Sequence, residues 1–90
     1  LTVQTSAAKA TETQARLAVE AANRTVESRA LALSQAQDLL TQTKILVQAG
    51  KATELDLEDA QLGVVSAQDD QFSAWADLYG ARLDLTAARS

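Results

Sequence analysis

The sequence predicts an all-α fold: a long antiparallel helical hairpin of the coiled-coil type, with one bend at about residues 50–53. Residues that disfavour helix are scarce, since proline is absent and glycine occurs three times, whereas nineteen of the 90 residues are alanine. Large apolar residues recur at seven-residue spacing in both halves of the chain. We therefore expect residues 1–90 to form a single hairpin, with helices at about 4–49 and 54–88 and a tip at 50–53.

The first helix is predicted by a row of large apolar residues that are seven apart, as in a coiled-coil seam. The row consists of Val19, Val26, Leu33, Leu40 and Val47. The companion seam position holds Ala15, Ala22, Arg29, Ala36 and Thr43. A further stripe of Ala18, Ala32, Leu39 and Leu46 widens the apolar face beyond what a two-stranded seam requires.

The bend is predicted by the segment "AGKATELD", residues 49–56. Gly50 suits the left-handed residue that ends many helices, because it has no Cβ to clash there. Thr53 suits the N-cap of the next helix, and Asp56, three residues later, completes a variant of the capping box. Only Lys51 and Ala52 are left as the connection, and a connection this short places the two helices antiparallel.

The second helix repeats the seven-residue pattern with alanine at one of its two seam positions. Large residues and one glutamine occupy the first position: Leu57, Val64, Gln71, Leu78 and Leu85. The other position is alanine throughout, at Ala60, Ala67, Ala74, Ala81 and Ala88. Alanine in register lets a neighbouring helix approach closely.

Both helices are apolar over more of their circumference than one seam can bury, which indicates further helical neighbours from the same parent chain or from copies of it. Phe72, Trp75 and Tyr79 share one face of the second helix, away from the alanine seam. We expect these aromatic residues to pack against helices, with a ligand or partner site as the alternative. At the tip, helix capping explains the residue types of Gly50, Thr53 and Asp56.

The tip is predicted to be a partner-binding end. Helix capping does not explain the residue types at Lys51, Ala52 and Leu55. In addition, the end of a helical hairpin is exposed, so a partner protein can bind there. The predicted tip site is Gly50, Lys51, Ala52, Thr53, Leu55 and Asp56.

Charge and composition exclude several classes of function. The net charge of −4 is distributed as +2 up to Thr53 and −6 from Glu54 onward, and the acidic half argues against binding nucleic acid or anionic lipid. Histidine and cysteine are absent, so we expect no enzyme activity, no cofactor and no metal site. No apolar run is long enough for a membrane-spanning helix.

Two charged rows run along the helices at multiples of seven residues. The acidic row is Asp56, Asp70, Asp77 and Asp84, and the basic row is Lys9, Arg16, Lys44 and Lys51. They are interpreted as solvated flanks. The alternative is that they set the register between neighbouring hairpins or face a water-filled lumen.

The segment "AGKATELDLEDAQLGVVSAQ" resembles the hairpin of the TolC-like outer-membrane efflux proteins. At this bend the family has, in order along the chain, a glycine, a variable or hydrophobic residue, a small residue, and Ser or Thr. Two further residues, then Asp-Val or Asp-Leu, and then an alanine three residues later complete the pattern. The positions that match in order are Gly50, Ala52, Thr53, Asp56, Leu57 and Ala60, and "AWADLYGARLDL" is similar to the returning helix. The family often has a hydrophobic residue where this chain has Lys51, and often an arginine or tyrosine a few residues before the glycine.

The resemblance implies that the chain is one helical hairpin of a longer protein, a trimer whose hairpins form an α-barrel in the bacterial periplasm below an outer-membrane β-barrel. It implies an efflux or type I secretion channel whose tips engage a periplasmic adaptor protein that joins it to an inner-membrane transporter.

Two alternatives remain. One is the α-hairpin of a periplasmic adaptor (membrane-fusion) protein, whose bend is similar at Leu46 and Thr53 but has arginine where this chain has Thr43. The other is a structural coiled-coil module without export partners.

Overall fold

The computed structural model describes the backbone of residues 2–89 and the side chains of residues 9–89. Helix α1 spans Thr2–Gln48 and helix α2 spans Glu54–Arg89, and no other helix or strand occurs in this part of the chain. The prediction of an all-α, antiparallel helical hairpin with one bend is confirmed. The helix ends lie within two residues of the predicted ones, and the connection is residues 49–53 rather than 50–53.

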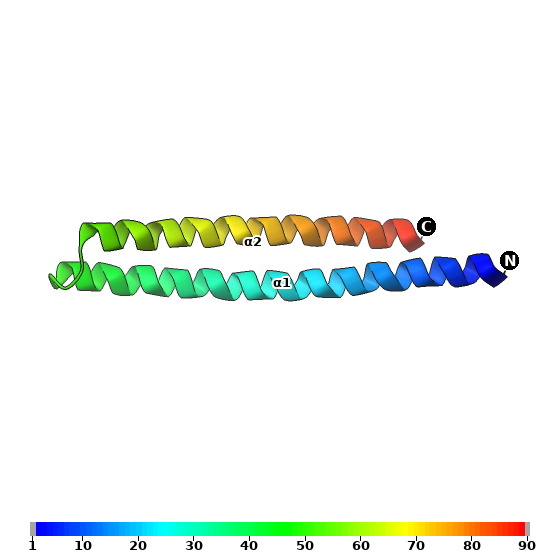
Figure 1. Cartoon of the computed structure of the whole chain (residues 1–90), viewed down its shortest axis with the longest axis horizontal. Helices are drawn as coiled ribbons and strands as arrows, with labels where there is room; N and C mark the ends of the chain where they lie inside the picture. Colours follow the sequence, from blue (N-terminus) through cyan, green and yellow to red (C-terminus); the bar gives the residue numbers. More distant parts are fainter. Residues whose placement is uncertain (1, 90) are drawn as a thin grey trace. The chain divides into compact units, whose positions relative to one another are not determined.

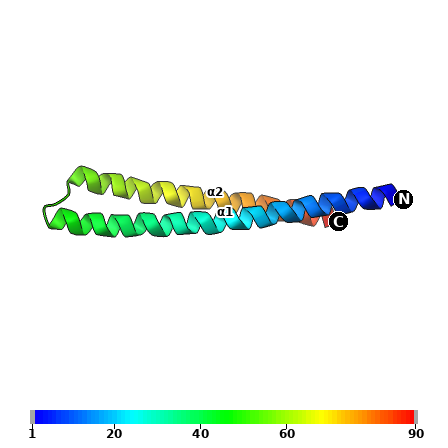
Figure 2. The same cartoon turned by 60° about the horizontal axis from the view of Figure 1, so that its bottom comes forward.

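The hairpin divides into two compact units, and both helices run through both of them. The tip unit, Ser28–Phe72, contains the end of α1, the bend and the start of α2. Its two helical segments lie side by side in opposite directions, joined by the bend (Figures 1 and 2). Its interior is thin, because small residues of α2 face α1: Ala60 and Ala67 are buried there, together with Thr43 of α1.

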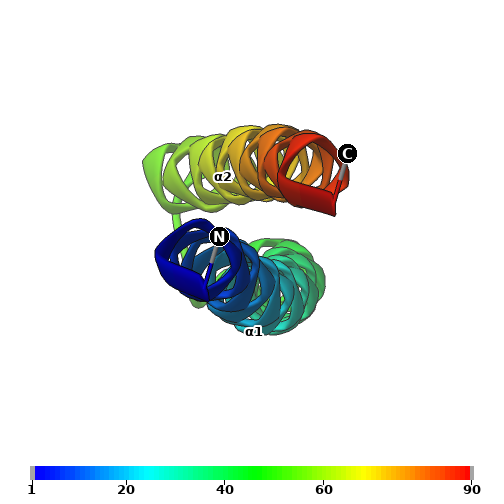
Figure 3. The same cartoon turned by 90° about the vertical axis from the view of Figure 1, so that its right-hand side faces the viewer.

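The second unit combines the part of α1 up to Glu27 with the part of α2 from Ser73 onward. Its core consists of Val26, Ala74 and Leu78, with Val19 and Ala22 packed against them. Leu78 is the most enclosed residue, with 1% of its surface exposed. Seen from the end, this part of α2 lies next to α1 (Figure 3).

One ionic cluster joins the two helices of the second unit. The Glu12 carboxylate accepts a hydrogen bond from Arg16, one turn along α1, with the Arg16 Nη2 atom 3.2 Å from Oε1. The same carboxylate oxygen lies 3.6 Å from Nε of Arg89 in α2. Because these side chains are partly solvated, we expect the cluster to contribute no more than about 1 kcal/mol to the pairing of the helices.

Each helix carries a second row of residues at seven-residue spacing, opposite its seam, and all of these residues are exposed. We call them the outer rows. The α1 outer row is Leu17, Arg24, Leu31, Asp38 and Ile45. The α2 outer row is Leu55, Leu62, Asp69, Ala76 and Leu83. Within the hairpin, these rows have no covering helix.

Candidate functional site

The end of α1 is closed by a complete Schellman motif centred on Gly50. Gly50 has φ of +75°, the left-handed conformation predicted from the sequence. The Lys51 N–H donates to the Leu46 carbonyl (2.8 Å), and the Gly50 N–H donates to the Val47 carbonyl (3.0 Å). These two bonds are the pair that defines the motif, and they satisfy carbonyl groups that the helix end would otherwise leave without donors.

The start of α2 is closed by a reciprocal capping box. The Asp56 N–H donates to Thr53 Oγ1 (3.2 Å), and the Thr53 N–H donates to Asp56 Oδ2 (2.9 Å). The Leu57 N–H then donates to the Thr53 carbonyl (3.2 Å), which is the first hydrogen bond of the helix. Thr53 and Asp56 therefore have the capping roles that their spacing predicted.

The same hydrogen bonds act on the ionisation of Asp56. The Thr53 N–H, and secondly the Thr53 side chain, hold the pKa of the Asp56 carboxyl below its ordinary value of 3.8. Asp56 is therefore a carboxylate at neutral pH, in the first turn of α2, where negative charge is favoured by the helix dipole.

Between these two caps the tip presents a short surface of mixed character. The side chains of Lys51 and Leu55 are exposed, and Ala52 is half-buried. Glu54 and Glu58 are exposed beside them, so one basic residue and several acidic ones surround the single large apolar side chain of Leu55. The predicted tip residues thus form one contiguous segment, held in place at both ends by backbone hydrogen bonds.

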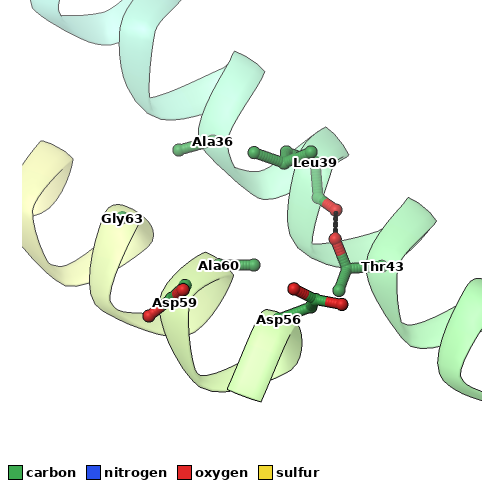
Figure 4. A pocket seen from close by; sticks show the side chains of 7 residues that line it. All are labelled: Ala36, Leu39, Thr43, Asp56, Asp59, Ala60 and Gly63. Atoms are coloured by element: carbon green, nitrogen blue, oxygen red, sulfur yellow. Dashed lines mark hydrogen bonds between the residues drawn. The ribbon is translucent and has the colours of Figure 1, made fainter. Parts of the chain in front are cut away.

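A pocket of about 260 Å³ lies beside the tip, between the two helices of the tip unit. Ala36, Leu39 and Thr43 line it from α1, and the α2 wall carries two carboxylates (Figure 4). The lining residues of α2 are Asp56, Asp59, Ala60 and Gly63. The buried Thr43 hydroxyl donates to the Leu39 carbonyl at 2.7 Å, so its polar atom is satisfied within α1.

The predicted seam residues lie between the helices. In α1, Val26 is buried, and Val19, Leu33, Leu40 and Val47 are half-buried. In α2, Ala60, Ala67 and Ala74 are buried and Ala81 is half-buried. At the companion position of α1, Arg29 is exposed.

The sequence interpretation missed the pocket. Gly63 could have been found, because it interrupts the acidic row between Asp56 and Asp70 and leaves space where an aspartate would stand. Phe72, Trp75 and Tyr79 lie outside the helix–helix contact, and Phe72 has 77% of its surface exposed. Any helix that packs against these aromatic residues must come from outside this hairpin.

Comparisons of the chain with protein-family models, curated proteins and solved structures found no match. The described residues contain no group of three or more acidic side chains placed to hold a metal ion. Neither helix, over residues 2–89, has the length and apolarity that a membrane crossing requires. The tip and the outer rows are therefore the features from which a function can be argued.

Proposed function

We propose that the chain is one periplasmic helical hairpin of an outer-membrane channel for efflux or type I secretion. In this proposal copies of the hairpin pack side by side into an α-barrel, and the tip docks a periplasmic adaptor protein. The full-length protein is a trimer, and the adaptor connects it to an inner-membrane transporter.

The observation that carries the proposal is that each helix has two opposite apolar faces. A helix in a two-stranded coiled coil buries one seam, whereas a helix in a closed layer must pack on two sides. In α1 the seam faces α2, while Leu17, Leu31 and Ile45 recur on the opposite face and are more than half exposed. In α2 the opposite face carries Leu55, Leu62 and Leu83, which are likewise more than half exposed.

A further row of apolar residues in α2, next to its outer row, extends this outer face. Val65, Phe72 and Tyr79 are seven apart, adjacent to the outer row, and each is more than half exposed. Large apolar side chains in such numbers on one helix face are typical of a surface that another protein segment covers. This supports side-by-side packing of hairpins.

The tip supports the docking part of the proposal. A Schellman motif followed at once by a capping box gives a bend with fixed backbone hydrogen bonds, and it leaves Lys51 and Leu55 exposed. A partner that binds such an end meets an ordered surface and loses little loop entropy.

Site-specific crosslinking in cells tests the docking assignment. A photoreactive side chain at Lys51 of the full-length protein should crosslink to a periplasmic adaptor, and the protein should fractionate with the outer membrane. The same side chain at Gln68, which is exposed on α2 away from the bend, is the matched control. Recovery of the protein in the cytosol, or equal adaptor crosslinking from both positions, would contradict the proposal.

The adaptor hairpin is the alternative function, and one residue distinguishes it. Adaptors of that family have an arginine where this chain has Thr43. Thr43 is buried between the helices and its hydroxyl is engaged by Leu39, so it cannot serve as an exposed contact. This favours the channel over the adaptor.

A further inference from the structure

We propose that the second unit binds an acidic helix of another protein along one flank of its seam. The binding surface, which we call the basic track, consists of Lys9, Arg16, Arg82 and Arg89, with Trp75 at its end. These residues lie outside the tip and outside the outer rows. The inference therefore goes beyond the proposed function and does not depend on it.

The basic track crosses both helices of the second unit. Its members recur at seven-residue spacing, as Lys9 and Arg16 in α1 and as Trp75, Arg82 and Arg89 in α2. The two rows adjoin at the Glu12 carboxylate, whose Oε1 atom lies 3.2 Å from Nη2 of Arg16 and 3.6 Å from Nε of Arg89. The cations of α1 and α2 therefore share one face of the hairpin.

Along this face the cations alternate between the two helices. Arg89 lies at the level of Glu12. Because the helices are antiparallel, one heptad back along α2 places Arg82 near the level of residue 19, and a second places Trp75 near residue 26. The order along the track is thus Lys9, Arg89, Arg16, Arg82 and then Trp75. Successive cations are about three to four residues of helical rise apart, or roughly 5 Å.

The basic track is positive on a chain whose net charge is −4. Within the track only Glu12 offsets the four cations, and Lys9 and Arg82 form no ion pair among the residues whose side chains are described. Among the same residues, the opposite flank of the seam in this unit carries Asp77 and Asp84 and no basic residue. An anionic partner is therefore attracted to one flank and repelled from the other.

The spacing of the cations fits a helix as the partner. An α-helix presents residues i, i+3, i+7 and i+10 on one face, at axial steps of about 4.5–6 Å, which match the steps along the track. Four acidic residues at that spacing place one carboxylate beside each cation. An apolar residue farther along the same face meets Trp75, which is 51% exposed.

A flat anionic membrane and a nucleic acid fit this surface less well. The track is a single line of cations, and Glu20, which is exposed one turn from Arg16, borders it on α1. A wide anionic surface that reaches the track also meets this carboxylate and the negative charge of the rest of the chain. A helix with one acidic row avoids both.

The fluorescence of Trp75 reports binding at the track directly, because it is the only tryptophan of the chain. The probe is a helical peptide of alanine, leucine and one row of glutamates at the spacing given above, and the control peptide has glutamine in place of each glutamate. With the 90-residue chain dilute enough to be monomeric, the glutamate peptide should shift the Trp75 emission to shorter wavelength in a saturable way. Added salt should weaken this binding, because exposed charges are screened.

Charge reversal tests the basic residues. Arg82→Glu and Lys9→Glu should each weaken binding of the glutamate peptide by about threefold to tenfold. Arg24→Glu is the matched control, since it makes the same charge change at an exposed residue of the same unit, in the outer row, and should leave binding nearly unchanged. Circular dichroism checks that every variant remains helical. Equal weakening by Arg82→Glu and Arg24→Glu, or equal binding of the glutamine peptide, would overturn the proposal.

The same titration separates an acidic helix from other anionic partners. Phosphatidylglycerol vesicles and a single-stranded oligonucleotide, at the same concentration of negative charge, should bind more weakly than the glutamate peptide. Tighter binding of either probe, or no response of Trp75 to the peptide, would refute the assignment to an acidic helix. Neither result would affect the docking tip or the packing of hairpins, which involve other residues.

Discussion

Gly50 and Gly63 are both open to a Cβ atom, since nothing lies within 4 Å of the position it would take, but their backbones differ. Gly50 has φ of +75°, whereas Gly63 lies within helix α2. Gly50→Ala should therefore destabilise the hairpin by about 1–2 kcal/mol through backbone strain alone. Gly63→Ala should stabilise it by about 0.5–1 kcal/mol. Thermal unfolding followed by circular dichroism measures both, and a stabilising Gly50→Ala would show that the bend does not need the left-handed residue.

Thr53 and Thr41 offer a second matched comparison. Thr53 caps α2, while the exposed Thr41 hydroxyl donates to the Gln37 carbonyl within α1. Thr53→Ala should cost about 1 kcal/mol because the Asp56 N–H loses its acceptor. Thr41→Ala should be neutral or slightly stabilising, since alanine is the better helix former. Denaturant unfolding should rank the two variants in this order, and the reverse order would argue against the capping box as a source of stability.

The lowered pKa of Asp56 makes one contribution to stability depend on pH. The folded-state pKa lies below the ordinary value of 3.8, so the contribution is complete above that pH and is lost as the pH falls through the folded-state pKa. The stability difference between the natural chain and Asp56→Asn should therefore shrink as the pH falls below 3.8. Unfolding measured at a series of pH values tests this. Glu58→Gln removes the same charge from the same helix outside the capping box and serves as the control.

Comparing Leu→Ala at a buried and at an exposed position of helix α2 separates the effect of burial from that of helix propensity. Leu78 is 1% exposed and belongs to the core with Val26 and Ala74, whereas Leu83 is 53% exposed in the outer row. Leu78→Ala should cost about 2–3 kcal/mol, and Leu83→Ala about 0.5 kcal/mol or less in the monomer. Unfolding at a concentration where the chain is monomeric measures both. Equal effects would mean that the contact with α1 does not stabilise the hairpin.

The helices were predictable because they depend on local rules. Seven-residue spacing predicted the helix faces that pack together, as Val26, Ala60 and Ala74 illustrate. The residue types at Gly50, Thr53 and Asp56 predicted the bend and its capping hydrogen bonds. The Glu12–Arg16 pair also follows from its spacing of four.

Features that depend on the pairing of the two helices could not be predicted in this way. The approach of Arg89 to Glu12 depends on which turn of α2 lies beside which turn of α1. The pocket between Leu39 and Gly63 likewise depends on which turns of α1 and α2 lie side by side. The shared face of Phe72 and Tyr79 predicts that they pack against helices, but it does not tell whether the covering helix belongs to the hairpin itself.

For the molecule as a whole, the outer rows predict that stability depends on concentration. If copies bind one another through these rows, association favours the folded state, and the unfolding temperature should rise as the chain is concentrated. Leu31→Lys and Leu62→Lys should each reduce this dependence, because they place a charge on the covered face. Glu58→Lys, outside the outer rows, is the control. An unfolding temperature that is the same at all concentrations would contradict the packing argument.

The bend is held by hydrogen bonds within the chain itself, and this affects how the tip can evolve. Because the two caps use main-chain groups together with Gly50, Thr53 and Asp56, the side chains at positions 51, 52 and 55 can be exchanged without disturbing the turn that carries them. If the tip docks another protein, as proposed, selectivity for one partner over another can change through these three side chains while the hairpin itself stays the same.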